Sequence, residues 1–173
     1  EKLRQGQILI DGVDLSTVPV ATLRSRLVMV PQDPAMFSAS VRYNIDPTNA
    51  YTDSEIWEAL SVVSLTDTVI AMDGGPDAPV TEGGSNLSVG QRQLVCFARA
   101  LLRKPKVVVM DEATAAVDNR TDELIQAVLK ERLKDCTVLT IAHRLNTIVD
   151  SDKLMVLHEG TLGEWDTPDA LKS

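Results

Sequence analysis

The hydrophobic positions of this chain fall into short runs and alternating stretches that predict β-strands. Runs rich in β-branched residues that stop at a proline or a charge are typical of strands in a parallel sheet. Stretches that alternate apolar and polar residues around a turn pair are typical of β-hairpins. The predicted strands are 26–30, 107–110 and 136–142, and the last two are expected to be buried. The predicted hairpins are 7–15, which turns at Asp11-Gly12, and 153–165, which turns at Glu159-Gly160. We expect the strand 107–110 to be buried on both faces.

Apolar residues spaced three or four apart predict helices between these strands. Thr52 and Glu55 form a capping-box pattern that opens a helix over 52–65. A longer helix over 88–104 has an apolar stripe formed by Leu94, Ala98, Leu101 and Leu102. The other predicted helices are a short helical turn over 16–24, with Pro19 near its start, and 121–134, N-capped by Thr121 or Asp118.

The alternation of helices and strands predicts a mainly parallel α/β sheet flanked by helices. Residues 33–85 interrupt this alternation with short helical stretches, which are punctuated by prolines. These prolines are Pro34, Pro47, Pro76 and Pro79. The segment therefore predicts a small helical insert rather than another layer of sheet.

Composition limits the classes of protein that the chain can represent. The 173 residues suffice for one domain with a core, and 44% hydrophobic with 24% charged residues is typical of a globular chain. The net charge of −8 makes broad nucleic-acid binding a poor expectation, so we expect no nucleic-acid partner. No apolar run approaches the length of a membrane span.

Two adjacent carboxylates, Asp111 and Glu112, follow directly after the predicted strand 107–110. Open α/β sheets bind ligands at the carboxyl ends of their strands. Asp111 offers the oxygen ligands that Mg²⁺ prefers, either directly or through a water. Glu112 is suited to orient and deprotonate an attacking water. The pair predicts a metal-assisted hydrolytic site.

A glycine-rich run, "EGGSNLSVGQ" (82–91), opens the helix 88–104. The first turn of a helix binds anions through its N–H groups and its dipole. Ser88 adds a hydroxyl donor, and Gly90 lets the backbone approach a phosphate closely. Taken alone, the same pattern is typical of an ordinary N-cap followed by a permissive glycine. The joint order and spacing of the candidate residues therefore decides between the two interpretations.

That joint order resembles the nucleotide-binding domain of ABC transporters over essentially the whole chain. "NLSVGQRQL" (86–94) is similar to the signature motif, with Val89 where the family more often has glycine, and "VVVMDE" (107–112) resembles Walker B with its catalytic glutamate. "ATAAVD" (113–118) resembles the D-loop, Gln32 the Q-loop glutamine and His143 the switch histidine. "VPQDPAMFSASVRYNIDP" (30–47), Val89 and "DEATAAVD" together resemble the C subfamily, the multidrug-resistance-associated exporters, and within it the second nucleotide-binding domain.

The resemblance implies a P-loop NTPase-like fold. Its catalytic α/β core would comprise residues 1–32 and 96–173, and a helical subdomain of residues 33–95 would carry the signature motif. The resemblance also implies partners: a second nucleotide-binding domain, transmembrane domains, and a transported organic anion, conjugate or drug. We expect the chain at the cytoplasmic face of a plasma or vacuolar membrane.

The family's mechanism implies a role for each candidate residue, with ATP and Mg²⁺ as cofactors. Two domains would sandwich two ATP molecules, and each signature motif would contact the γ-phosphate of the ATP held by the other domain. The signature residues are Ser88, Val89, Gly90 and Gln91. Asp111 and Gln32 would contact Mg²⁺, and Glu112 and His143 would be catalytic. Gln32 would also sense the phosphate, and Asp118 would couple the two sites.

The family's phosphate loop, G-x-x-G-x-G-K-[ST], has no counterpart in this chain, which contains no Gly-Lys pair. The family places that loop before the position of Glu1, so we expect the chain to be a fragment that does not hydrolyse ATP by itself.

Two soluble ABC-type ATPases are alternatives to the transporter. The chromosome-maintenance type inserts a long coiled coil between Q-loop and signature, whereas about 55 residues without heptads separate Gln32 from Ser88. The translation-factor type lacks membrane spans, and the full-length gene would distinguish it.

Overall fold

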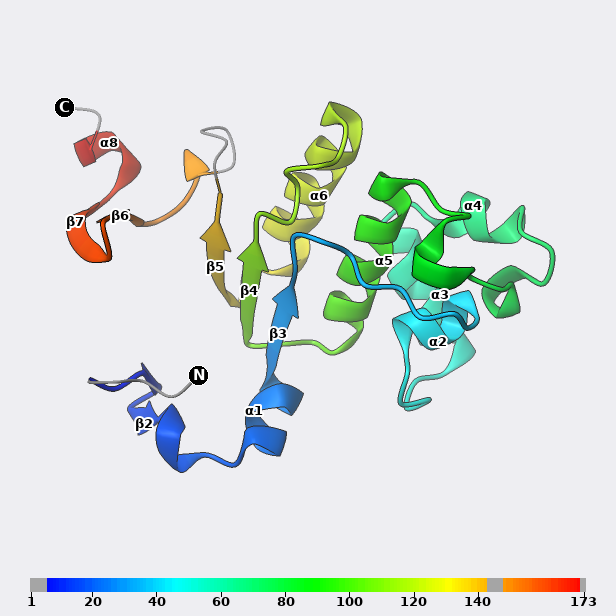
Figure 1. The fold of residues 1–173 in the computed structure, drawn as a ribbon, viewed down its shortest axis with the longest axis horizontal. Helices are drawn as coiled ribbons and strands as arrows, with labels where there is room; N and C mark the ends of the chain where they lie inside the picture. The colour runs from blue at the N-terminus through cyan, green and yellow to red at the C-terminus, as the bar shows by residue number, and fades with distance from the viewer. Residues whose placement is uncertain (1–5, 143–147, 172–173) are drawn as a thin grey trace.

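A parallel sheet of three strands lies in the middle of the molecule (Figure 1). The computed structural model describes residues 6–142 and 148–171. The sheet consists of β3 (Leu27–Val30), β4 (Val107–Asp111) and β5 (Thr137–Ile141), in the order β3-β4-β5. Val30 pairs with Met110 and Asp111 pairs with Ile141, so all three strands end at the same edge. The predicted parallel α/β fold is confirmed.

Two long helices, α5 (Val89–Leu102) and α6 (Asn119–Arg132), lie on one side of this sheet (Figure 1). Val108 and Met110 of β4 join Phe97 of α5 and Ile125 of α6 in one hydrophobic core. The apolar stripe of α5 faces this core, because Leu94, Ala98 and Leu102 are buried and Leu101 is partly buried against it.

The prediction that 107–110 is buried on both faces is wrong, as is the prediction that 136–142 is a buried strand. In β4 only the alternate residues Val108 and Met110 are buried, and in β5 every residue is exposed or half-buried. Leu139 of β5, for example, is 55% exposed. Neighbouring side chains of a strand point to opposite faces. In the described part of the chain, α5 and α6 cover one face only, and β5 is an edge strand.

Every element assigned between residues 33 and 85 is a helix, and this confirms the predicted helical insert. The capping box is also confirmed, since Thr52 N–H donates to Glu55 Oε2 at 2.9 Å and Glu55 N–H to Thr52 Oγ1 at 3.4 Å. Buried Ile56 and Leu60 join the same hydrophobic core as α5. The elements are α2 (Val41–Ile45), α3 (Asp53–Val62), α4 (Thr66–Ile70), η2 (Gly75–Asp77) and η3 (Glu82–Gly84).

Both predicted hairpins are present, and each turns at the expected pair. Asp11 and Gly12 have φ values of 50° and 78°, the left-handed conformations that a two-residue hairpin turn requires. The hairpins are β1 (Leu9–Ile10) with β2 (Val13–Asp14), and β6 (Leu154–His158) with β7 (Thr161–Asp166).

The predicted helical turn over 16–24 is split in two, because Pro19 is the N-cap of the second helix. The two parts are η1 (Leu15–Thr17) and α1 (Val20–Arg26), and α8 (Pro168–Leu171) ends the described chain. No helix among the described residues is long and apolar enough to cross a bilayer.

Candidate functional site

The carboxyl ends of the parallel strands bring three candidate residues to one edge of the sheet. Asp111 ends β4, Glu112 follows it, and Gln32 comes two residues after β3. Val30, the last residue of β3, pairs with Met110, so Gln32 leaves β3 at the same end of the sheet as the two carboxylates. His143 follows β5, the third strand of the sheet, but lies outside the described residues.

The backbone of Glu112 has a left-handed conformation with φ of 45°. For a residue other than glycine this conformation costs about 1 kcal/mol or more, so the surroundings must hold it. The Glu112 N–H donates to the Ile141 carbonyl at 2.9 Å, and the Glu112 carbonyl accepts from Ala115 N–H at 2.9 Å. These two bonds anchor the residue on both sides, so that its side chain leaves the strand end in a fixed direction.

Asp111 and Gln32 fit the ligand chemistry of Mg²⁺. Both carry side-chain oxygens at the strand edge, and Asp111 is half-buried whereas Gln32 is exposed. Among residues 6–142 and 148–171, no group of three or more His, Cys, Asp or Glu side chains is arranged to hold a metal. Mg²⁺ usually takes one or two protein oxygens and completes its shell with water and substrate phosphate, so the side-chain oxygens of Asp111 and Gln32 are compatible with it.

A small cavity of about 30 Å³ lies beside Glu112, and it is large enough for a water molecule. Its lining includes Glu112, Thr114, Thr140 and Ile141. A larger cavity of about 290 Å³ lies at the opposite, amino ends of the strands, beside Pro105 and Asp135, and includes none of the candidate residues. Of these two cavities only the small one borders a candidate residue, and most of the residues that line it are apolar.

The first turn of α5 is held by a reciprocal pair of hydrogen bonds between Ser88 and Gln91. Gln91 N–H donates to Ser88 Oγ at 3.1 Å, and Ser88 N–H donates to Gln91 Oε1 at 2.9 Å. Ser88 therefore serves as an ordinary N-cap, with its hydroxyl oxygen accepting from the helix. Ser88 and Val89 are exposed, so this turn is open to an anion from outside the domain.

The start of α6 lies against the start of α5. Asp118, one of the two predicted N-caps, accepts from Thr121 N–H at 3.0 Å and from Thr121 Oγ1 at 2.7 Å. These bonds lower the pKa of Asp118, with the side-chain bond as the larger cause. A Cβ built on Gly90 would lie 3.2 Å from Thr121 Oγ1 and 3.6 Å from Asp118 Oδ2. The structure thus groups residues 88–91 with Asp118, and Gln32 with Asp111 and Glu112.

Several residues that hold these groups together were missed by the sequence analysis. Gln93 is 1% exposed, and its side chain donates to the Pro31 carbonyl at 3.2 Å, beside Gln32. Arg92 donates to the carbonyls of Gly84 and Leu87, at 3.2 and 3.0 Å, and so closes the glycine-rich run. A polar residue next to the apolar stripe of α5 was the signal that could have identified Gln93.

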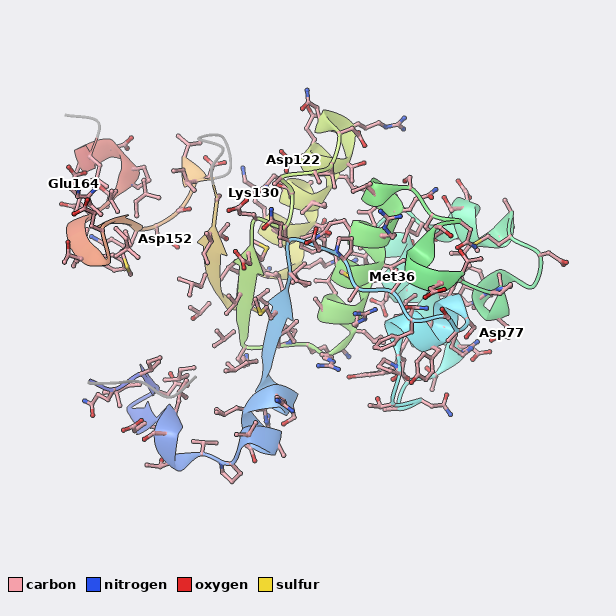
Figure 2. All side chains as sticks on the ribbon, viewed as in Figure 1. Met36, Asp77, Asp122, Lys130, Asp152 and Glu164 are labelled. Atoms are coloured by element: carbon pink, nitrogen blue, oxygen red, sulfur yellow. The ribbon has the colours of Figure 1, made fainter. Side chains whose placement is uncertain are left out.

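The glycine-rich run also packs against the insert through Gly84. A Cβ on Gly84 would lie 2.7 Å from Met36 Cγ and 2.8 Å from Arg92 Cδ, and its φ is 71°. Figure 2 labels Met36 beside α5, on the side of the insert. Glycine is required at this position both by the backbone and by the space available.

Arg99 anchors the beginning of the insert to α5. Its Nε donates to the Asn44 carbonyl at 2.7 Å, its Nη2 donates to the Ala35 carbonyl at 3.3 Å, and its guanidinium lies 5.8 Å from the centre of the Phe37 ring. Burial lowers the pKa of Arg99. The fully buried Asn44 accepts from Phe37 N–H at 2.8 Å, which closes the loop between them.

The family model described as "ABC transporter" matches residues 1–115. The chain belongs to the ABC transporter family. It is 53% identical over 168 residues to "ATP-binding cassette sub-family C member 2" of Rattus norvegicus, covering 97% of this chain and 11% of that protein. It is 52% identical over 164 residues to "ATP-binding cassette sub-family C member 4" of Homo sapiens, covering 95% of this chain and 12% of that protein.

The ABC transporter fold is also found by structural comparison. A bacterial Atm1-family ABC exporter, solved with ATP bound, superposes with a TM-score of 0.90 and 37% identity, covering 97% of this chain and 30% of that chain. The expected fold and the C subfamily are therefore confirmed, and the soluble alternatives are not favoured. The chain spans only about a tenth of the length of the curated relatives above.

Proposed function

We propose that this chain is part of an ATP-binding and ATP-hydrolysing domain of a C-subfamily ABC exporter, which couples hydrolysis to transport of organic anions, conjugates or drugs. The observation that carries the proposal is the Walker B strand end, where Glu112 is held in a fixed left-handed conformation beside a water-sized cavity. Hydrolysis of a phosphoanhydride requires a carboxylate that can orient a water and accept its proton, and the held backbone of Glu112 supports that role.

Each residue at the strand edge has a role in the proposed reaction. Asp111 and Gln32 would hold Mg²⁺, which neutralises charge on the phosphates when it is bound. Glu112 would orient the attacking water and accept its proton. His143, assigned from its place in the sequence, would contact the γ-phosphate.

The signature turn would serve a different ATP molecule, held by a second nucleotide-binding domain. The exposure of Ser88 and Val89 supports this assignment, because an anion outside the domain can reach the first turn of α5. Gly90 and Gln91 complete that turn, and Asp118 would couple the two sites. Transmembrane domains at the membrane would then follow the closing and opening of the paired domains. The division into a core of 1–32 and 96–173 and a helical subdomain of 33–95 stays a prediction.

Substitution of Glu112 by glutamine in the intact exporter tests this function. Glu112→Gln keeps the size of the side chain but removes its basicity, so steady-state ATP turnover is expected to fall about a hundredfold or more, with ATP binding retained. Glu164→Gln is the matched control, because Glu164 is exposed on β7, away from the strand edge (Figure 2). Retention of more than about half of the turnover by Glu112→Gln would refute the role given to Glu112.

A further inference from the structure

Gly90 faces α6 rather than open solvent. A Cβ at this position would lie 3.2 Å from Thr121 Oγ1 and 3.4 Å from Thr121 Cγ2. The first distance is shorter than ordinary van der Waals contact, so an alanine would have to displace Thr121. Gly90 is inside α5 and is not among the glycines with positive φ. Its backbone therefore does not require glycine, and a helix favours alanine over glycine. The space taken by Thr121 is a reason that favours glycine here.

Thr121 is itself held in place by Asp118. Its N–H donates to Asp118 Oδ1 and its hydroxyl to Asp118 Oδ2, at 3.0 and 2.7 Å. A β-branched side chain in a helix has few χ1 rotamers, and these two bonds select one of them. The hydroxyl donates to Asp118, while its oxygen and the methyl group occupy the space that a Cβ at position 90 would need. Thr121 thus connects the two helix starts: it is hydrogen-bonded to Asp118 at the start of α6 and lies close to Gly90 in the first turn of α5.

We propose that Thr121 is a positioning residue for the signature turn. By filling the space above Gly90 it sets the separation of the starts of α5 and α6, and through Asp118 it keeps the signature turn and the D-loop in one fixed relation. This inference rests on the proposed function, because only there do residues 88–91 bind a nucleotide. It adds the close approach of Thr121 to the close approach of a phosphate as a reason for glycine at position 90.

A suppressor experiment in the intact exporter separates these two reasons. Gly90→Ala should raise the ATP concentration for half-maximal turnover about tenfold and change the maximal rate less, because overpacking displaces the turn that binds the phosphate. Thr121→Ala removes both atoms that a Cβ at position 90 would meet. The double variant Gly90→Ala with Thr121→Ala should therefore return to within about twofold of Thr121→Ala alone.

Thr121→Val is the matched control, since valine keeps two atoms on Cβ and lacks the hydroxyl. It should not rescue Gly90→Ala if the contact is steric. Hydrogen exchange of the amides in 88–94, measured without nucleotide, gives a readout that does not depend on activity. We expect faster exchange than in wild type in Gly90→Ala, and also in Thr121→Ala because the residue that positions the turn is lost. The double variant should exchange no faster than Thr121→Ala alone.

Two results would overturn the inference. A double variant as impaired in ATP dependence as Gly90→Ala would show that glycine is needed for a different reason, such as the approach of the phosphate. Rescue of hydrogen exchange without rescue of ATP dependence would show that the contact is structural only. Failure of the proposed function is distinguishable, because Glu112→Gln would then retain turnover whatever Thr121 does.

Discussion

The side-chain amide of Gln93 donates a 3.2 Å hydrogen bond to the main-chain carbonyl of Pro31. Gln93 lies on α5 just after the signature turn, whereas Pro31 directly follows β3 and precedes Gln32. A buried amide is costly to leave unpaired, so this bond holds the strand end and the helix in register. The proposed function assigns Gln32 and the signature turn to different ATP molecules, and Gln93 joins them within one domain.

Replacement of Gln93 by leucine should loosen that connection. Gln93→Leu keeps the volume of the side chain but leaves the Pro31 carbonyl without this donor, so the free energy of unfolding is expected to fall by about 1–3 kcal/mol. Hydrogen exchange in residues 31–36 should become faster. Gln7→Leu is the control, because Gln7 is exposed. Equal exchange in wild type and Gln93→Leu would show that the bond does not fix the strand end.

Arg99 allows a second test of how the insert is held. Arg99→Lys keeps the charge but cannot reach the carbonyls of Asn44 and Ala35 with two separate donors. We expect the free energy of unfolding to fall by about 1–3 kcal/mol, since hydrogen bonds from a charged group are lost. Arg103→Lys, one turn later at an exposed position, should change it by less than about 0.5 kcal/mol. Chemical denaturation of the intact protein measures both, and equal losses would contradict the anchoring role.

Asp118 should contribute to stability in a pH-dependent way. Its pKa is lowered from 3.8 because Thr121 donates two hydrogen bonds to the carboxylate. A pKa that is lower in the folded state stabilises the fold above the unfolded pKa, and this contribution is lost as pH falls through the folded pKa. The difference in unfolding free energy between wild type and Asp118→Asn should therefore be constant well above the ordinary pKa of 3.8 and shrink as the pH falls below it. Asparagine still caps the helix, so the variant isolates the charge. A pH-independent difference would contradict this role of the charge.

The sequence predicted correctly those elements that depend on residues close together in the chain. The hairpin turn at Asp11 and Gly12 depends on two residues that tolerate positive φ, and the capping box of Thr52 and Glu55 depends on a spacing of three. Both could be predicted without knowing what packs against them. The parallel direction of the strands followed from the alternation of strands and helices.

Features that depend on contacts between distant segments could not be predicted in the same way. An apolar run such as β5 has the composition of a buried strand, but its burial depends on which elements cover its faces. One reason for glycine at position 90 depends on Thr121, which is remote in the sequence and only becomes a neighbour when α6 packs beside α5. Asp111 and Glu112 were recognisable because adjacent carboxylates at a strand end are a chemical pattern, whereas the role of Gln93 is visible only through its partner.

The last prediction concerns which ATP the signature turn serves. Gly90→Asp would not test this well, because a side chain at position 90 would also crowd Thr121. Val89 is better, since it is 40% exposed and occupies the first position of α5. A glutamate at a helix start stabilises the helix by about 0.3–1 kcal/mol, yet it repels a phosphate that binds there. Val89→Glu should therefore keep or raise the stability of the domain while it weakens ATP-dependent closure. Val89→Gln, of the same size without the charge, is the control.

Photolabelling of the two halves of the exporter with an azido-ATP analogue identifies the site that Val89→Glu affects. If the signature turn acts across the interface, labelling should fall in the partner half and persist in the half that contains this chain. The repulsion acts within roughly 10 Å at physiological salt, so it should also weaken as the salt concentration rises. Val89→Gln should show neither effect. Loss of labelling confined to the half that contains this chain would mean that the turn binds its own domain's nucleotide, and the assignment across the interface would then be wrong.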